Sequence, residues 1–220
     1  MNGNILLLFE YLCLGCSFCL LHPLNSSTGK HILWIGLVTV FAETLSFCCY
    51  NFYGMRTYGI YNVSVPTIIL IILAAFYAVL KKGLSGRIIK ALCIAYVVFC
   101  IINFACLQGY SKFASLNYVA GGIALTLTAA MYLYHLIRQP VQLYLHTQPL
   151  FWLASAVLLM YVPKSCLYAF YTYFSGNQQQ MAAFSNTFHL FNNIASILFY
   201  ILLSIAATCR ILFKSTIKHY

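Results

Sequence analysis

The sequence predicts an all-α, polytopic membrane protein with seven transmembrane helices, and three features of its composition carry this prediction. Hydrophobic residues make up 63% of the 220 residues, only 6% are charged, and the mean hydropathy is +0.87. A typical soluble domain has about 25% charged residues. The 12 basic and 2 acidic side chains are too few to cover the surface of a soluble protein of this length. A soluble enzyme, a nucleic-acid-binding domain and a disordered chain are therefore excluded.

Seven stretches are long and apolar enough to cross a bilayer, which takes about 20 residues of helix. They cover residues 4–21, 31–50, 60–80, 88–107, 118–138, 149–173 and 185–209. The connections between them are short. We therefore expect residues 1–220 to form a single seven-helix transmembrane domain without a soluble domain.

The first stretch begins like a secretory signal peptide, but such a signal starts with a positive region, and residues 1–12 contain no lysine or arginine. We therefore interpret residues 4–21 as a true span. Its Cys13, Cys16 and Cys19 are spaced like metal ligands. On one helix successive thiols turn by about 60°, so they cannot close a tetrahedral site alone. We expect no metal and no cofactor.

The distribution of lysine and arginine predicts the orientation, because cytoplasmic loops carry an excess of both. The first, third and fifth connections, the start of the fourth span and the C-terminal tail are basic. Their residues are Lys30, Lys81, Lys82, Arg87, Lys90, Arg138, Arg210, Lys214 and Lys218. The opposite side has Arg56 and Lys112. We expect the N-terminus outside, the C-terminus in the cytoplasm, and the protein in the inner membrane of the cell.

Ionisable residues inside a span are candidates for function, because lipid disfavours them. The chain has two acidic residues, Glu10 and Glu43, and both lie in predicted spans, as do Lys164 and His189. At 1.5 Å per residue, all four lie roughly 6–13 Å below the outer ends of their spans. Two carboxyl groups and one amine at similar depths predict a charged cluster in the outer half. The alternative is a Glu–Lys pair that only locks two helices.

Neutral polar residues follow the same helix faces at steps of three and four, and hydrocarbon cannot satisfy them, so we expect them to face inward. Span six carries Tyr161 beside Lys164, span four carries Asn103, and span seven carries Asn186 and Asn193. Together they predict a polar chamber open to the outside. The candidate ligand-binding residues are Glu10, Glu43, Asn103, Tyr161, Lys164, Asn186, His189 and Asn193. The alternative role for the amides and hydroxyls is to hold helices together.

Two of the predicted spans contain a proline. Pro66 and Pro163 interrupt spans three and six, and each removes a backbone donor. Because Pro163 precedes Lys164, we expect it to act as a hinge.

Aromatic residues near the predicted span ends are typical of the interfacial belts of membrane proteins. We assign that role to Tyr50, Phe52, Tyr53, Tyr58, Tyr110, Phe113, Tyr118, Tyr144, Phe151, Trp152, Tyr171 and Tyr173.

These features favour a receptor- or sensor-like module that binds a small ligand in the outer chamber and signals to a cytoplasmic partner. Besides lipids, the expected partners are that ligand and either the signalling protein or further copies of the chain, but no nucleic acid. The first alternative is an oligomeric ion-conducting or pore-forming protein. The second is a membrane-embedded lipid-modifying enzyme. It is less favoured than a non-enzymatic role because only one histidine, His189, is predicted near the two carboxyl groups.

Three short motifs resemble those of small seven-helix integral membrane proteins of Bacteroidetes-type bacteria. They are Ala42-Glu43 in span two, Phe151-Trp152 at the start of span six and Asn192-Asn193 in span seven. The resemblance would extend over nearly the whole chain. It implies the seven-helix fold and no particular activity.

The predicted topology can be tested by cysteine labelling. In a cysteine-free background, Lys30→Cys, Ser85→Cys and Ser215→Cys should resist an impermeant thiol reagent in intact cells, because the charge asymmetry places them inside. Ser111→Cys and Gly176→Cys should react. The reverse labelling pattern would overturn the orientation.

Overall fold

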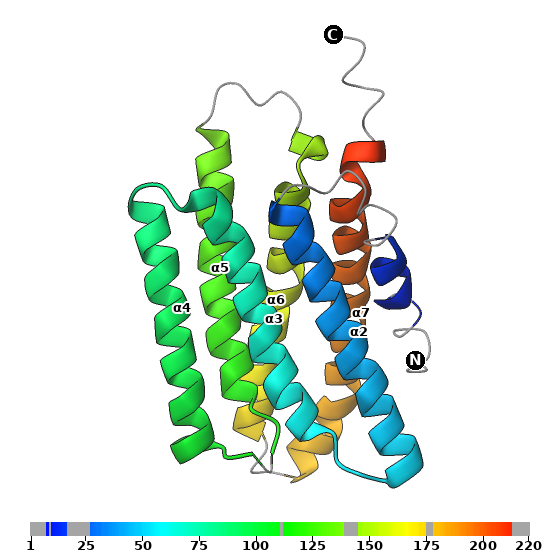
Figure 1. Cartoon of the computed structure of the whole chain (residues 1–220). Helices are drawn as coiled ribbons and strands as arrows, with labels where there is room; N and C mark the ends of the chain where they lie inside the picture. The colour runs from blue at the N-terminus through cyan, green and yellow to red at the C-terminus, as the bar shows by residue number, and fades with distance from the viewer. Residues whose placement is uncertain are drawn as a thin grey trace.

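The structure is a bundle of long helices. It is a computed structural model that describes residues 8, 10–16, 27–110, 112–138, 145–174 and 178–212. Within this part of the chain, six helices are long and apolar enough to cross a membrane (Figure 1). They are α2 (Ser27–Tyr53), α3 (Tyr58–Leu80), α4 (Leu84–Ile102), α5 (Ser115–Ile137), α6 (Pro149–Phe174) and α7 (Gln178–Leu212). The π-helix η1 (Asn103–Leu107) continues α4, and the 3₁₀-helix η2 (Leu145–Thr147) precedes α6.

These helices confirm the all-α, multi-pass prediction. Predicted spans two to seven coincide with α2 to α7 to within about four residues when η1 is counted with α4, except that α7 begins seven residues before the predicted start of span seven. A long apolar run bounded by polar connections is a local signal. The predicted first span, residues 4–21, lies largely outside the described residues. Its residues 10–16 are helical. Seven crossings and the orientation of the termini remain predictions.

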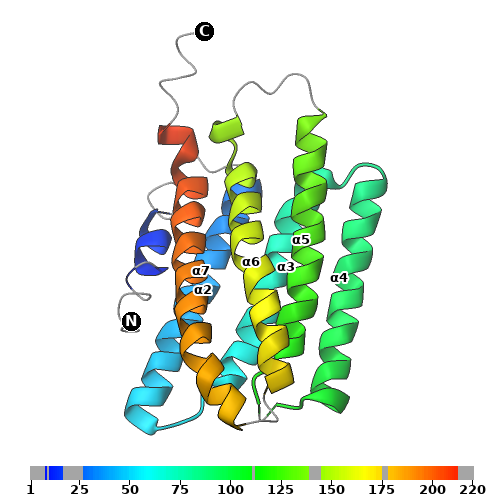
Figure 2. The ribbon, with the colours of Figure 1, turned by 180° about the vertical axis from the view of Figure 1, so that it is seen from behind.

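The helices form two rows. α4, α3 and α2 lie side by side in one row, and α5, α6 and α7 form the other, with α3 packed on α5 (Figures 1 and 2). α4 joins the rows at one edge by contacting both α3 and α5. At the other edge, α2 touches α6 and α7 over a small area only. The rows are therefore tightly joined on the α4 side and looser on the α2 side.

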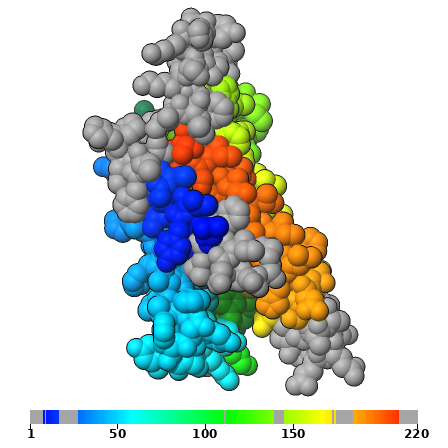
Figure 3. Space-filling view, turned by 90° about the vertical axis from the view of Figure 1, so that its right-hand side faces the viewer, coloured from blue at the N-terminus to red at the C-terminus, as the bar shows by residue number. Residues whose placement is uncertain are grey.

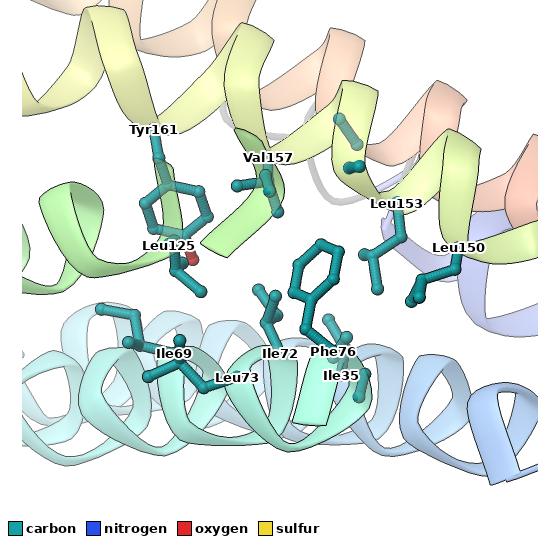
Figure 4. Packing of buried hydrophobic residues seen from close by; sticks show 14 of the residues in the cluster. Ile35, Ile69, Ile72, Leu73, Phe76, Leu125, Leu150, Leu153, Val157 and Tyr161 are labelled. Atoms are coloured by element: carbon teal, nitrogen blue, oxygen red, sulfur yellow. The ribbon is translucent and has the colours of Figure 1, made fainter. Parts of the chain in front are cut away.

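A continuous apolar core fills the space between α3, α5 and α6 (Figure 4). Ile72, Phe76, Leu125, Leu153 and Val157 are completely buried in it. Lipid tails are as apolar as leucine, so these contacts stabilise the bundle through close packing rather than through exclusion of water. These completely buried residues lie in the half of the bundle near the N-terminus of α6.

Small residues let two of these helices approach closely. A Cβ atom added to Gly122 of α5 would collide with the Ser165 hydroxyl of α6. Glycine is therefore required here by space rather than by backbone conformation, as is common where membrane helices cross. This contact lies next to Lys164 in the sequence of α6 and brings α5 and α6 close together there.

The segment of residues 10–16 packs against the outside of α2 and α7, where the two rows are loosely joined (Figure 3). Glu10 and Cys13 are each 1% exposed. The hydroxyl groups of Tyr11 and Thr44 are hydrogen-bonded at 2.7 Å, which ties the segment to α2. Towards the C-terminal end of α2, that helix and α7 diverge, and atoms from the middle of the chain are visible between them in Figure 3.

Candidate functional site

A cavity of about 590 Å³ lies where the two rows separate, between α2 and α3 on one side and α6 and α7 on the other. It has the size of a small-molecule site, for which roughly 300–1,000 Å³ is usual. The polar and charged residues in its lining are Glu10, Thr39, Glu43, Thr57, Ser64, Lys164, Ser185, His189, Asn192 and Ser196. Its other lining residues are mainly aromatic.

Five of the eight candidate ligand-binding residues line this cavity. They are Glu10, Glu43, Tyr161, Lys164 and His189. They come from the 10–16 segment, α2, α6 and α7, which are far apart in sequence. The structure therefore brings the ionisable residues of the predicted spans to one place. Their role in binding remains a prediction.

Lys164 is held by a hydroxyl group rather than by a carboxylate. Its side chain is 6% exposed, and its Nζ donates a hydrogen bond of 2.6 Å to Ser196 Oγ of α7. Ser196 in turn donates to the backbone carbonyl of Asn192 at 2.9 Å. Lysine has three N–H donors, so this bond leaves donors on the ammonium for another group in the cavity.

Glu43 is anchored on the opposite wall. Tyr61 of α3 donates its hydroxyl to Glu43 Oε2 at 2.8 Å. In the described part of the chain, neither Glu43 nor Glu10 forms an ion pair with Lys164. The alternative of a Glu–Lys pair that locks two helices therefore does not hold. The acidic and basic groups instead face each other across the same cavity.

Glu10 is the most unusual group in the site. Both of its carboxyl oxygens are buried and have no hydrogen-bond partner among the described residues. Tyr200 of α7 approaches the carboxyl group without the geometry of a hydrogen bond. Glu43 and Lys164 lie within electrostatic range. A buried carboxyl group with no partner is costly, so a group that donates hydrogen bonds or carries positive charge would be stabilised here.

Two neutral side chains in the lining also have unused hydrogen-bonding capacity. Among the described residues, the Tyr118 hydroxyl and the amide oxygen of Asn192 are buried without partners. Native proteins leave few such groups, and each calls for an explanation. Together with Glu10, they give the cavity three buried polar groups from three separate helical segments that a ligand could satisfy.

Asn186 and Asn193 lie outside the cavity lining. The cavity face of α7 runs instead through Ser185, Asn192 and Ser196. At about 100° per residue, the two asparagines are turned by roughly 80–100° from the centre of that face. Residues spaced by three or four do not stay exactly on one side of a helix. A face chosen from polar residues alone was therefore rotated by about one residue from the face that lines the cavity. Phe188 and Phe199, which share the true face, would have corrected it.

Asn103 has a structural environment. It is fully buried, and its Nδ2 donates to Asn117 Oδ1 at 2.8 Å and to Gln108 Oε1 at 3.1 Å. These bonds join the end of α4 to the start of α5. α4 lies at the outer edge of the bundle and contributes no residue to the cavity. The sequence cannot show this, because the polar face of α4 looks the same whether it meets a cavity or a neighbouring helix.

The belt interpretation of the aromatic residues is wrong for part of the set. Tyr118 is 5% exposed and lies inside the bundle, where it lines the cavity. Tyr58, Phe113 and Tyr171 also line the cavity, but none of these three is buried. Other members agree with a belt because they are strongly exposed, as the ring of Tyr50 is. A residue near the end of a helix can face lipid or the bundle interior, and only the packing of the helices decides which.

Sequence reasoning missed several further lining residues. Tyr61 and Ser64 of α3 belong to the cavity, as does Asn192 of α7. In α3 the spacing of Tyr61 and Ser64 by three residues was an available signal, because it marks one helix face. No group of three potential metal ligands comes together in the described residues.

The chain was compared with known proteins. No family model, curated protein or solved structure matches it.

The hydrogen bond between Tyr61 and Glu43 can be tested by a double-mutant cycle on the unfolding free energy. We expect a coupling of roughly 0.5–2 kcal/mol between Tyr61→Phe and Glu43→Gln, the range for polar contacts between membrane helices. The coupling between Glu43→Gln and Lys164→Met should be smaller, because no direct bond joins them.

Tyr58→Phe is the matched control, since Tyr58 lies one turn away on α3 and is 41% exposed. Its effect should be additive with that of Glu43→Gln. A larger coupling to Lys164 than to Tyr61 would contradict the geometry described above.

Proposed function

We propose that this multi-pass membrane protein is a receptor-like module that binds a small organic ligand in the cavity between α2–α3 and α6–α7. The observation that carries the proposal is the convergence of buried polar groups without partners, Glu10, Tyr118 and Asn192, on a cavity of ligand size. Sites of this kind combine a mainly apolar wall with a few polar groups that orient the ligand.

The connection between α6 and α7 offers a route from the cavity to the far end of the bundle. Lys164 of α6 bonds Ser196 of α7 inside the cavity. A ligand bound beside Lys164 would disturb this bond and so shift α6 against α7. At the opposite end, Cys209 of α7 donates to the carbonyl of Thr147 in η2, just before α6. A cytoplasmic partner that binds this end of α6 and α7 would respond to the change in their relative position.

Pro163 supports α6 as the moving element. α6 continues through Pro163, whose side chain is exposed on the outer face of the helix, while the neighbouring Lys164 is buried. Proline has no N–H, so the carbonyl of Leu159 lacks its usual partner in the helix. A break in the backbone ladder directly beside the charged residue is where a bend in α6 would be least costly.

The alternatives have less support. A pore through one chain would have to cross the apolar layer of Ile72, Phe76 and Val157, which are completely buried. A lipid-modifying enzyme would need a nucleophile activated by a base. Among the described residues Ser196 and Lys164 are in contact, but Ser196 donates its hydroxyl hydrogen to the carbonyl of Asn192 and not to the amine. The ligand-binding proposal accounts for the unpartnered groups directly.

Filling the cavity tests the proposal. Ala42 of α2 is a buried lining residue, so Ala42→Phe should block the site, whereas Ala91→Phe on exposed α4 should leave it open. Purified protein in nanodiscs would be screened by thermal shift against a library of cationic, neutral and anionic small molecules. At a concentration of 100 Kd, a ligand stabilises by about 2.7 kcal/mol.

We expect at least one class of compound to raise the melting temperature of the wild type and of Ala91→Phe but not of Ala42→Phe. If no compound shifts the wild type, or if the shift persists in Ala42→Phe, the proposal fails.

The hinge is tested by Pro163→Ala. Alanine restores the backbone hydrogen bond to Leu159, so stability should hold or rise. The ligand-induced shift should fall, because a straightened α6 displaces the part of the cavity wall that it forms with Tyr161 and Tyr168. Pro66→Ala in α3 is the matched control and should keep the shift. Pro163→Ala with lower stability and a normal shift would remove α6 from the mechanism.

A further inference from the structure

We propose that the occupant of the cavity is an organic amine with a single positive charge and an apolar, ring-containing body. This inference rests on the proposed function, namely that the cavity between α2–α3 and α6–α7 binds a small ligand. It adds the chemical class of the ligand, which the charges, the orphaned carboxyl group and the aromatic lining define together.

The charge balance of the lining favours a monocation. Glu10 and Glu43 supply two carboxyl groups, and Lys164 supplies one ammonium group. When Glu10, Glu43 and Lys164 are all ionised, these three groups carry one excess negative charge. Buried charge without a partner is strongly unfavourable. An occupant with one positive charge removes the excess, whereas an anion would double it and a neutral molecule would leave it.

The position of the orphaned carboxyl group indicates where the amine would sit. Both oxygens of Glu10 lack partners among the described residues, while Glu43 already accepts a bond from Tyr61. Glu10 is also buried, at 1% exposed. An ammonium group placed between Glu10 and Glu43 would donate charge-assisted hydrogen bonds, which are the strongest available to a carboxylate.

Lys164 limits the charge that the cavity accepts. Its ammonium is held on the α7 wall by Ser196 at 2.6 Å, away from the wall that carries Glu43 and Tyr61. An ammonium ligand near the carboxyl groups is therefore compatible with it. A second positive charge on the ligand would meet Lys164 without a further acid to balance it, which disfavours polyamines.

The aromatic lining explains the apolar body. Six of the lining rings contact one another as one continuous cluster, namely Phe113, Tyr118, Tyr161, Tyr168, Phe188 and Phe199. Tyr118 stacks on Tyr161 with ring centroids 5.4 Å apart and meets Tyr168 at 4.5 Å. Ring faces attract cations as well as other rings. This wall therefore suits both ends of such an amine.

The test uses three probes that share one ring and differ in charge. They are 2-phenylethylamine, which is an ammonium ion at neutral pH, neutral 2-phenylethanol and anionic phenylacetate. Their affinities for the full-length protein in phosphatidylcholine nanodiscs would be measured by thermal shift and by tyrosine fluorescence. We expect the amine to bind most tightly, and Glu10→Gln to weaken it about ten-fold through loss of a charged hydrogen bond.

Lys164→Met provides a change of opposite sign that a folding defect would not mimic. Removal of the nearby like charge should strengthen binding of the amine several-fold. Lys90→Met, on the exposed surface of α4, is the matched control and should leave the affinity unchanged. This pair keeps the inference testable if Glu10→Gln does not fold.

Three results would overturn the inference while leaving the proposed function intact. They are tighter binding of phenylethanol or phenylacetate, an unchanged amine affinity in Glu10→Gln, and library ligands that bind in the cavity but include no amine. If neither the probes nor any library compound bind to the wild type, the proposed function itself fails.

Discussion

The arrangement of the helices follows from the need to keep three ionisable side chains away from lipid. A charged residue at the centre of a membrane helix costs about 2.5–3.5 kcal/mol or more. Glu10, Glu43 and Lys164 lie on three separate segments, so they can share one interior volume only if those segments face one another. This requirement fixes the rotation of α2 and α6 and draws residues 10–16 against the gap between α2 and α7.

The two halves of the bundle have different physical character. Near the N-terminus of α6, apolar side chains such as Leu153 and Phe76 interlock without exposure. Towards the other end, the rows separate and leave a cavity lined by charged and aromatic residues. Close-packed interiors transmit displacement rather than absorb it. A change at the cavity would therefore be passed along α6 and α7 through the packed half.

Similar polar residues serve different purposes according to their place in the bundle. Asn103 and Asn117 bond each other to hold the connection between α4 and α5. Asn192 leaves its amide oxygen unpartnered in the cavity. Interhelical polar contacts in membranes are worth only about 0.6 kcal/mol on average. Hydrogen bonds between helices are therefore weak evidence of function. A buried polar atom without a partner is stronger evidence only where it lines a cavity, because, among the described residues, Asn103 Oδ1 and Asn117 Nδ2 are also unpartnered and lie outside it.

The sequence by itself determined the helices and the identity of the charged groups. Long apolar runs define α2 to α7 because span length is a local property, and Lys164 and Tyr161 share a face because three-residue spacing does so on any helix. Tertiary structure alone decided which faces meet. Asn103 packs into a helix connection, Asn186 and Asn193 turn aside from the cavity, and Tyr118 enters it. These outcomes depend on the crossing and rotation of whole helices, which arise from long-range packing and which the spacing of polar residues alone does not reveal.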